Sequence, residues 1–404
     1  MRPLSYKLLA LSVISTALAA GVAKADTPDS AYQVNVLYTN ELFDNTGGGL
    51  QTGAVDSNNV DVSLQIDAGK AFGLSGGTIH LEGFYADANS FSDKKEGSLD
   101  DVGSIDTNGP QMWRVYQAYY DQQIGKTDVR FGIYDLETEF SNTKPALLFL
   151  NKNFSWNTTF DLSGNAAGTI GPGNFPDTPL ALRVRQTFGG GWSAQVVVAD
   201  AADDDPNHPA DNAVIFSSKY GVTTMGELDY EPTKHTKLMA GLWGETSQLQ
   251  AYGPLAPGGA LRNVWDNEGG YVGGSTRLIQ GEGRRGLDAF FTLGVGKPEV
   301  TAVNQSFNAG FTYTGPFAAR PDDKLGLAFA ENHGPDTYLQ YLASTGAGRT
   351  YSYEDSIELT YRAHVLKDFV TLQPDVQYIT HPGYEYKNSL VVGLHVEVSD
   401  IFNL

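Results

Sequence analysis

The sequence predicts an all-β protein, a 16-stranded antiparallel transmembrane β-barrel. Three observations lead to this prediction: alternating polar and apolar segments recur along the chain, the links between them alternate in length, and an export signal precedes them. The clearest alternation lies at residues 60–67, where Val60 and Val62 are interleaved with Asp61 and Ser63. Because successive side chains of a strand point to opposite faces, such a segment is apolar on one face and polar on the other.

The N-terminus has the pattern of an export signal over residues 1–25. Arg2 and Lys7 provide the basic start, an apolar core follows, and Ala23-Lys24-Ala25 forms a small-x-small cleavage site. The apolar core is too short to cross a bilayer, and no apolar run of about 18 residues occurs later. The sequence therefore predicts a protein that leaves the cytoplasm, with a barrel over residues 26–404.

The composition narrows the class of protein further. Asp and Glu number 47 against 27 Lys and Arg, giving a formal net charge of -20, which argues against nucleic acid as a partner because nucleic-acid binding rewards basic residues. The chain contains no cysteine, so its fold relies on neither disulfides nor thiolate metal sites. The seven histidines are scattered, and we expect no cofactor and no metal site.

The candidate strands follow one another along the whole chain. They lie at 32–42, 60–67, 77–91, 111–122, 127–136, 180–188, 192–201, 216–230, 236–246, 269–278, 286–296, 306–314, 324–332, 356–365, 370–378 and 390–398. The last three are the most regular; in one of them Ile357 and Leu359 share a face opposite Glu358. Pro374 would remove one ladder hydrogen bond and ordinarily argues against a central strand at that point.

The connections between these segments alternate between short and long. The short ones are 74–76, 123–126, 189–191, 231–235, 280–285, 315–323 and 366–367, and the long ones are 43–59, 92–110, 137–179, 202–215, 247–268 and 333–350. A meander that crosses a membrane has short periplasmic turns at one end and long extracellular loops at the other. A soluble Greek-key sandwich, the alternative fold, has no reason to follow this rhythm. A closed barrel also leaves no unpaired strand edge in lipid.

If the apolar faces meet lipid, the opposite positions line an aqueous lumen. By parity the inward residues are Asp61, Gln65, Asp67, His80, Glu82, Arg130, Arg183, Arg185, Glu227, Asp229, Asp288, Glu358, Arg362 and Asp375. The phase of segment 111–122 is ambiguous, and we expect it to turn inward Trp113, Gln117, Tyr119 and Asp121. Mixed charges favour hydrogen bonding to uncharged polar solutes, whereas an anion channel would have a cationic ring. The alternative is that most of these residues are a solvated wall without individual roles.

The longest connection, residues 137–179, is a candidate constriction loop. Loops of this length are usually functional or disordered, and this one is rich in aromatic residues that are costly to leave in water. Folded into the pore, Trp156 would present a ring for the C–H face of a sugar and form a sugar-selective eyelet; alternatively, the rings only pin the loop to the inner wall. The candidate constriction residues are Trp156, Phe154, Arg130, Arg183, Arg185, Glu82, Asp121, Glu358 and Arg362.

Several segments resemble the carbohydrate-selective porins of the OprB type. In chain order they are GGTIHLEGF (76–84), VYQAYYDQ (115–122), VRFGIYDLETEF (129–140), FNAGFTYTGPF (307–317), IELTYR (357–362), LQPDVQYITHPG (372–383) and LVVGLHVEV (390–398). The resemblance implies an outer-membrane barrel that passes glucose and related sugars by facilitated diffusion, without a cofactor. Pro374 lies within the LQPDVQYITHPG segment, and its presence in the family motif implies a tolerated bulge or a strand start there. Members of the family commonly end on an aromatic residue, and Phe402 is the residue here that keeps the phase of the last strand.

The sequence therefore predicts a passive sugar porin of the bacterial outer membrane rather than an enzyme. Glu227 and Asp229 share a strand face, but a glycosidase pair also requires a defined gap and a cleft. The alternatives are a general diffusion porin, which like the sugar porin would conduct ions, and a secreted all-β polysaccharide-binding protein or hydrolase. The expected partners are small sugars and the lipid and lipopolysaccharide of the outer membrane, with either a homotrimer or a monomer as the assembly.

Overall fold

The computed structural model describes residues 30–87, 89–107, 111–164, 173, 175–202, 214–215, 218, 220–255, 259, 261–366 and 369–404. The export signal predicted over residues 1–25 lies outside the described residues. Within them, no helix is long and apolar enough to cross a membrane.

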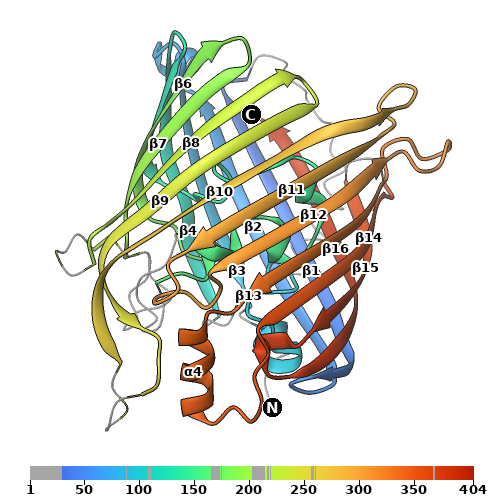
Figure 1. Ribbon diagram of the computed structural model, residues 1–404. Coiled ribbons are helices and arrows are strands. Elements are labelled where there is room, and N and C mark those ends of the chain that lie inside the picture. The colour runs from blue at the N-terminus through green and yellow to red at the C-terminus, as the bar shows by residue number, and fades with distance from the viewer. Residues whose placement is uncertain are drawn as a thin grey trace, which may run out of the picture.

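The described residues form a closed barrel of 16 strands (Figure 1). The strands are β1 (Tyr32–Gly49), β2 (Gly53–Asp67), β3 (Gly77–Ala86), β4 (Met112–Ile124), β5 (Thr127–Ile133), β6 (Leu180–Gly189), β7 (Trp192–Asp200), β8 (Val222–Thr233), β9 (Thr236–Ala251), β10 (Arg262–Gln280), β11 (Gly286–Gly296), β12 (Gln305–Thr314), β13 (Lys324–His333), β14 (Tyr353–His364), β15 (Val370–Thr380) and β16 (Lys387–Asn403). Each strand pairs antiparallel with the next, and β1 pairs with β16, where Val34 lies opposite Phe402. The predicted fold class is confirmed, and each of the sixteen predicted segments overlaps one strand.

The two ends of the barrel differ in the length of their connections. In Figure 1 the end that carries the C-terminus has the short turns, and the opposite end carries the longer loops and helix α4 (Asp336–Thr345). Two predicted loops are wrong, however. Residues 43–59 are mostly paired strand, since β1 and β2 remain in register out to Asn45 and Gly53. Both ends of residues 247–268 are also strand, because β9 continues to Ala251 and β10 begins at Arg262.

The outer face of the barrel is apolar and the inner face is polar, as the alternation predicts. Ile357 and Leu359 are exposed on the outer face, while Glu358 and Thr360, which alternate with them, are buried inside. Aromatic side chains gather near both ends of the outer face, as in the pairs Tyr85 with Trp113 and Trp192 with Tyr230. This arrangement matches an apolar band bounded by two aromatic girdles.

One inward prediction, that for Trp113, is wrong because the sequence does not reveal a bulge in β4. Glu82 of β3 pairs with Gln117, but the next residue, Gly83, pairs with Val115. The extra residue changes the phase of the strand at that point. Trp113 therefore lies on the outer face and is 72% exposed. Beyond the bulge the inward prediction for Gln117, Tyr119 and Asp121 agrees with their contacts to other inner-wall side chains.

Pro374 causes neither a bulge nor a strand start. It pairs in register with Leu394 of β16, and β15 continues on both sides of it. On the β14 side the pairing is interrupted between Thr360–Asp375 and Ala363–Leu372, and the register is the same on both sides of the gap. The missing N–H of proline is therefore accommodated by a local gap in one ladder.

The described parts of two long connections lie against the inner wall and occupy the interior of the barrel. They are the β3–β4 loop (residues 87–111) and the β5–β6 loop (residues 134–179). Their short helical turns are η1 (Ser92–Glu96), η2 (Ala146–Leu148), η3 (Lys152–Phe154) and α3 (Thr158–Asp161); the remaining short elements are α2 (Ala68–Phe72) and η4 (Pro382–Tyr384). In the β5–β6 loop, Phe160 belongs to an apolar cluster that includes residues of β6 to β10, and Phe149 belongs to one that includes residues of β11 and β13. In the β3–β4 loop, Phe91 and Val102 pack against β1, β15 and β16.

Candidate functional site

A cavity of about 370 Å³ opens in the lumen beside the β4–β5 and β6–β7 turns. It is lined by Asp121, Gln123, Lys126, Asp128, Arg130, Glu139, Arg183, Arg185 and Thr187. All except Glu139 come from β4 to β6 or the turn between β4 and β5, and Glu139 is supplied by the β5–β6 loop. Each strand contributes residues two apart, because only alternate side chains face the lumen.

The register of the strands places charged groups directly opposite one another. Asp121 lies opposite Arg130, and Arg130 lies opposite Arg183. Like charges directly opposite are destabilising in a sheet. The two arginines therefore need carboxylate partners, and these come from both the wall and the loop.

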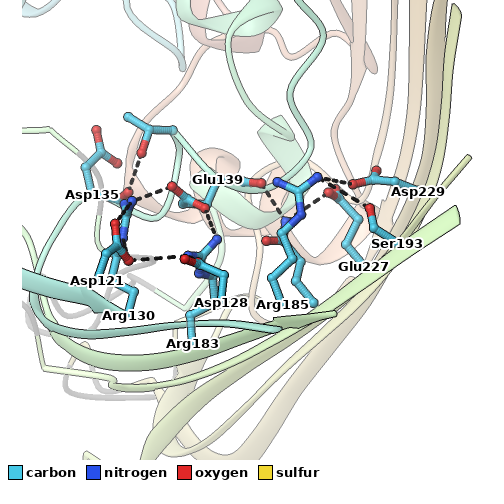
Figure 2. Close-up of polar contacts among 12 residues, drawn as sticks. Asp121, Asp128, Arg130, Asp135, Glu139, Arg183, Arg185, Ser193, Glu227 and Asp229 are labelled. Carbon is cyan, nitrogen blue, oxygen red and sulfur yellow. Dashed lines mark hydrogen bonds and ion pairs between the residues drawn. The ribbon is translucent and has the colours of Figure 1, made fainter. Parts of the chain in front are cut away.

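Glu139 supplies the compensating charge between the two arginines (Figure 2). Its carboxylate lies 2.8 Å from Arg130 Nη1 and 2.7 Å from Arg183 Nη1. Arg130 also forms a two-pronged bond to Asp121, at 2.9 and 2.6 Å. Arg183 binds Asp128 in addition. These residues fasten the start of the β5–β6 loop to the wall of the barrel.

A stack of planar side chains continues this wall towards β3. The guanidinium of Arg130 lies 4.0 Å from the centre of the Tyr119 ring, which stacks on His80 at 4.9 Å. Glu82 accepts a hydrogen bond from Gln117 at 2.8 Å and lies 3.0 Å from His80. The structure thus places the predicted residue Glu82 next to the group formed by Arg130, Arg183 and their carboxylate partners, which is called the Arg130 cluster below. Glu82 itself is held by Gln117 and His80.

Glu227 on β8 fixes the next part of the β5–β6 loop. It accepts hydrogen bonds from the backbone N–H of Ser141 and from the Tyr271 hydroxyl, both at 2.7 Å. Lys237 on β9 donates to the carbonyl of Asn142 at 3.1 Å. Buried carboxylates that accept such bonds act as anchors, and this part of the loop follows the wall closely.

Arg185 differs from the other two arginines of the cavity. Its nearest partners are the Ser193 hydroxyl at 3.4 Å and an Asp229 oxygen at 3.7 Å, both distances being long for a charged hydrogen bond (Figure 2). Asp229 is also bound by Lys237 at 3.2 Å.

Two predicted constriction residues lie on β14, on the far side of the barrel. Glu358 is fully buried and accepts hydrogen bonds from the backbone N–H groups of Leu150 and Asn151, at 2.8 and 3.0 Å. Arg362 binds Glu397. The structure therefore makes Glu358 a loop anchor, and it does not bring these two residues together with the Arg130 cluster.

The eyelet predicted around Trp156 does not form. Trp156 is only 3% exposed and packs edge-on against Phe160, with ring centres 5.0 Å apart. Phe154 is equally buried and packs against Phe149 and Phe290. The rings pin the loop to the inner wall, which is the alternative that the sequence left open, because burying them against apolar wall residues removes them from water.

The sequence does not reveal that the β3–β4 loop lies inside the barrel. Lys152 of the β5–β6 loop lies 2.8 Å from Asp101 of the β3–β4 loop and joins the two. Its pKa is raised above its ordinary value by Asp101, against the effect of burial. Apart from the apolar residues Phe91 and Val102 in a polar stretch, no pattern in the sequence marks this contact.

Buried carboxyl groups surround this junction between the two loops. Burial raises the pKa of Asp106 to about 7, with Asp101 adding to the effect, and burial raises the pKa of Asp161 to about 6. Asp106 accepts hydrogen bonds from the backbone N–H groups of Phe91 and Ser92, at 2.8 and 2.9 Å. Within the described part of the chain, no three His, Cys, Asp or Glu side chains are arranged to hold a metal ion.

A closed barrel with an apolar outer face, a charged lumen and inward loops defines the class of outer-membrane porins. The chain belongs to the carbohydrate-selective porin family of the OprB type, whose family model matches residues 51–399. This confirms the family predicted from the sequence and the location in the bacterial outer membrane.

Individual relatives agree with this assignment. Porin B of Pseudomonas aeruginosa is 29% identical over 338 residues, covering 76% of this chain and 72% of that protein. The putative porin QuiX of Acinetobacter baylyi is 22% identical over 403 residues, covering 90% and 88%. The high-pH structure of Pseudomonas putida OprB has the same fold, with a TM-score of 0.80 at 22% identity over 92% of this chain and 94% of that chain. Salmonella typhi OmpF, solved with daunomycin, is more distant, with a TM-score of 0.57 at 10% identity over 94% of this chain and all of that chain.

Proposed function

We propose that the protein is a passive channel for small neutral sugars, and that the cavity beside Arg185 is the narrow part of their path. The charge balance of this cavity carries the proposal. Four cations and three carboxylates line it, and the neighbouring wall adds Lys237 opposed by Glu227 and Asp229. Taken together, five positive and five negative groups give no net charge. Such a wall offers donors and acceptors to hydroxyl groups without attracting one sign of ion.

The size of the cavity fits the same class of solute. Its volume of about 370 Å³ lies at the lower end of the ~300–1,000 Å³ typical of small-molecule sites. A monosaccharide is at the small end of such ligands. We propose that residues 137–179 act as the constriction, because their anchors Glu139, Ser141 and Leu150 hold the loop against both sides of the lumen.

The residues considered for catalysis have other partners, which supports a channel rather than an enzyme. Glu227 accepts hydrogen bonds from the loop backbone and from Tyr271, and Asp229 is bound by Lys237. These contacts hold the loop and the wall in place.

The remaining partners we propose are the lipid and lipopolysaccharide that meet the outer face. A closed barrel is complete as a monomer, and light scattering in detergent distinguishes it from a homotrimer.

The test is conductance in a planar lipid bilayer. Purified protein should insert in discrete current steps, and millimolar glucose on either side should reduce the ion current through the open channel. Gluconate, of similar size but negatively charged, should block less well. Equal passage of all small solutes, without block by any sugar, would instead establish a general diffusion porin.

A further inference from the structure

We infer that Arg185 is the residue that binds and selects the sugar, with Asp128 as its hydrogen-bond acceptor partner. This inference rests on the proposed function and adds to it the atoms that make the channel specific. The ligand class is a neutral monosaccharide bound through two adjacent hydroxyl groups.

Among the three arginines of the cavity, Arg185 keeps its donors available. The side chain of Arg183 is 4% exposed and that of Arg130 is 13% exposed, and each is held by carboxylates at less than 3 Å. Arg185 is 37% exposed, and its partners lie at 3.4 and 3.7 Å. Arg130 and Arg183 therefore serve the loop, whereas Arg185 presents its planar fork of donors to the water of the cavity.

Asp128 lies directly opposite Arg185 in the register of β5 and β6. Opposite charges in this position commonly pair. Here the carboxylate binds Arg183 instead, and the Arg185 guanidinium turns towards Ser193 and Asp229 on the β7 side. The Asp128 side chain remains 25% exposed. A donor fork and a carboxylate thus face the same cavity without neutralising each other.

A donor fork beside a carboxylate recognises groups that both donate and accept hydrogen bonds. A sugar hydroxyl both donates and accepts hydrogen bonds, so adjacent hydroxyls can accept from Arg185 and donate to Asp128. A carboxylate solute would gain from Arg185 but would be repelled by Asp128 and Asp229. A cation would meet the opposite difficulty. The arrangement therefore selects neutral polyols over ions of either sign, and the other cavity residues Gln123 and Thr187 offer further polar atoms.

The experiment compares Arg185→Gln, Arg185→Lys and Arg277→Gln as single channels in a planar bilayer titrated with glucose. Arg277 is the matched control, because it also faces the lumen and carries one positive charge, but it is paired through two bonds with Asp288 on another part of the wall. Loss of a charged hydrogen bond corresponds to roughly tenfold in affinity. We expect the half-blocking glucose concentration to rise about tenfold in Arg185→Gln and to change less than twofold in Arg277→Gln.

The lysine variant separates hydrogen bonding from charge. Arg185→Lys keeps the positive charge but loses the fork, so the reversal potential in a salt gradient should match that of the wild type while glucose block weakens. Asp128→Asn should weaken glucose block and improve block by gluconate. The heat-dependent migration of each variant on a gel shows that its barrel is folded.

The outcomes separate the two proposals. A wild-type channel that glucose does not block would overturn the proposed function itself. A wild-type channel that glucose blocks, with block unchanged in Arg185→Gln, would overturn the role of Arg185 and leave the sugar porin standing. Equal weakening in Arg185→Gln and Arg277→Gln would show a general effect of charge and would also overturn the assignment.

Discussion

Glu139 Oε2 lies 2.7 Å from Arg183 Nη1, so a carboxylate of the β5–β6 loop is bound by an arginine of the barrel wall. Its second oxygen binds Arg130. The position at which the loop enters the lumen is therefore set by electrostatics, and hydrophobic packing of Phe140 and Trp156 takes over further along.

Replacing Glu139 by Gln should release the start of the loop. Breaking a buried ion pair costs about 3–5 kcal/mol, because a charge is left without its partner. We expect larger fluctuations of the open-channel current and a lower temperature of heat-induced unfolding on a gel. Glu299→Gln is the control, since its pair with Arg262 is largely exposed and screened by solvent. A quiet current in Glu139→Gln would mean that this ion pair does not hold the loop.

Replacing Trp156 by Ala should lower stability without a direct effect on sugar binding. Truncating a buried Trp costs about 3–5 kcal/mol. The milder Trp156→Phe keeps an aromatic ring next to Phe160, and its half-blocking glucose concentration should stay within twofold of the wild-type value. If Trp156→Phe folds normally but loses sugar block, the eyelet interpretation would be restored.

Gly326 on β13 marks a close approach of the loop to the wall. A Cβ atom at this position would lie 2.8 Å from side-chain atoms of both Leu148 and Phe149. Gly326→Val should therefore push this part of the loop into the lumen, at a cost of about 1–3 kcal/mol, and reduce the single-channel conductance. Gly348→Val, at an exposed position with no atom within 4 Å of the added Cβ, should leave conductance unchanged. Equal conductance in both variants would argue against a tight contact at Gly326.

The junction of the two loops should weaken as the pH rises through about 7. The pKa of Asp106 is about 7 in the folded protein, above the ordinary value of about 3.9, so the docked loops hold a proton that separated loops release. The stability from this proton is fully present at low pH and is lost as the pH rises through the folded-state pKa. Hydrogen-exchange protection of the Phe91 and Ser92 amides, corrected for intrinsic exchange, should therefore be greater at pH 5.5 than at pH 8.5.

Asp106→Asn should reduce this pH dependence, because an amide does not titrate in this range, and should leave the part that comes from other buried carboxyl groups such as Asp161. The neighbouring exposed residue Asp93 provides the control, and Asp93→Asn should keep the wild-type profile. Protection that rises with pH in the wild type would contradict the sign of the prediction.

The strands of the barrel can be predicted from local alternation in the sequence, whereas the packing of the loops inside the barrel cannot. The phase of residues such as Ile357 and Glu358 is set by alternation within one strand, so the sequence alone predicts which faces lipid. The inward prediction for Trp113 is wrong because it depends on a bulge, and the position of a bulge is set by pairing with the neighbouring strand. The loop prediction for residues 43–59 is wrong because the β1–β2 ladder continues through polar residues, where no apolar alternation reveals a strand.

The sequence predicts which residues face the lumen at the candidate site, but it does not predict which residues they contact. Parity places Arg130, Arg183 and Arg185 on the lumen face, as observed. The loop residue Glu139 binds Arg130 and Arg183 but not Arg185. No local sequence pattern encodes the position of Glu139 relative to these arginines. The burial of Trp156 and the anchoring role of Glu358 likewise depend on contacts between residues far apart in the chain.

The pairing of Val34 with Phe402 has a consequence for biogenesis. The two strands that complete the ring come from opposite ends of the sequence, so β1 keeps an open edge until the last residues of the chain have been delivered. An open edge is a template for pairing with other chains and for aggregation. A newly exported molecule therefore has to be protected until it is complete, and shortening β16 by a few residues would leave a ring that cannot shut.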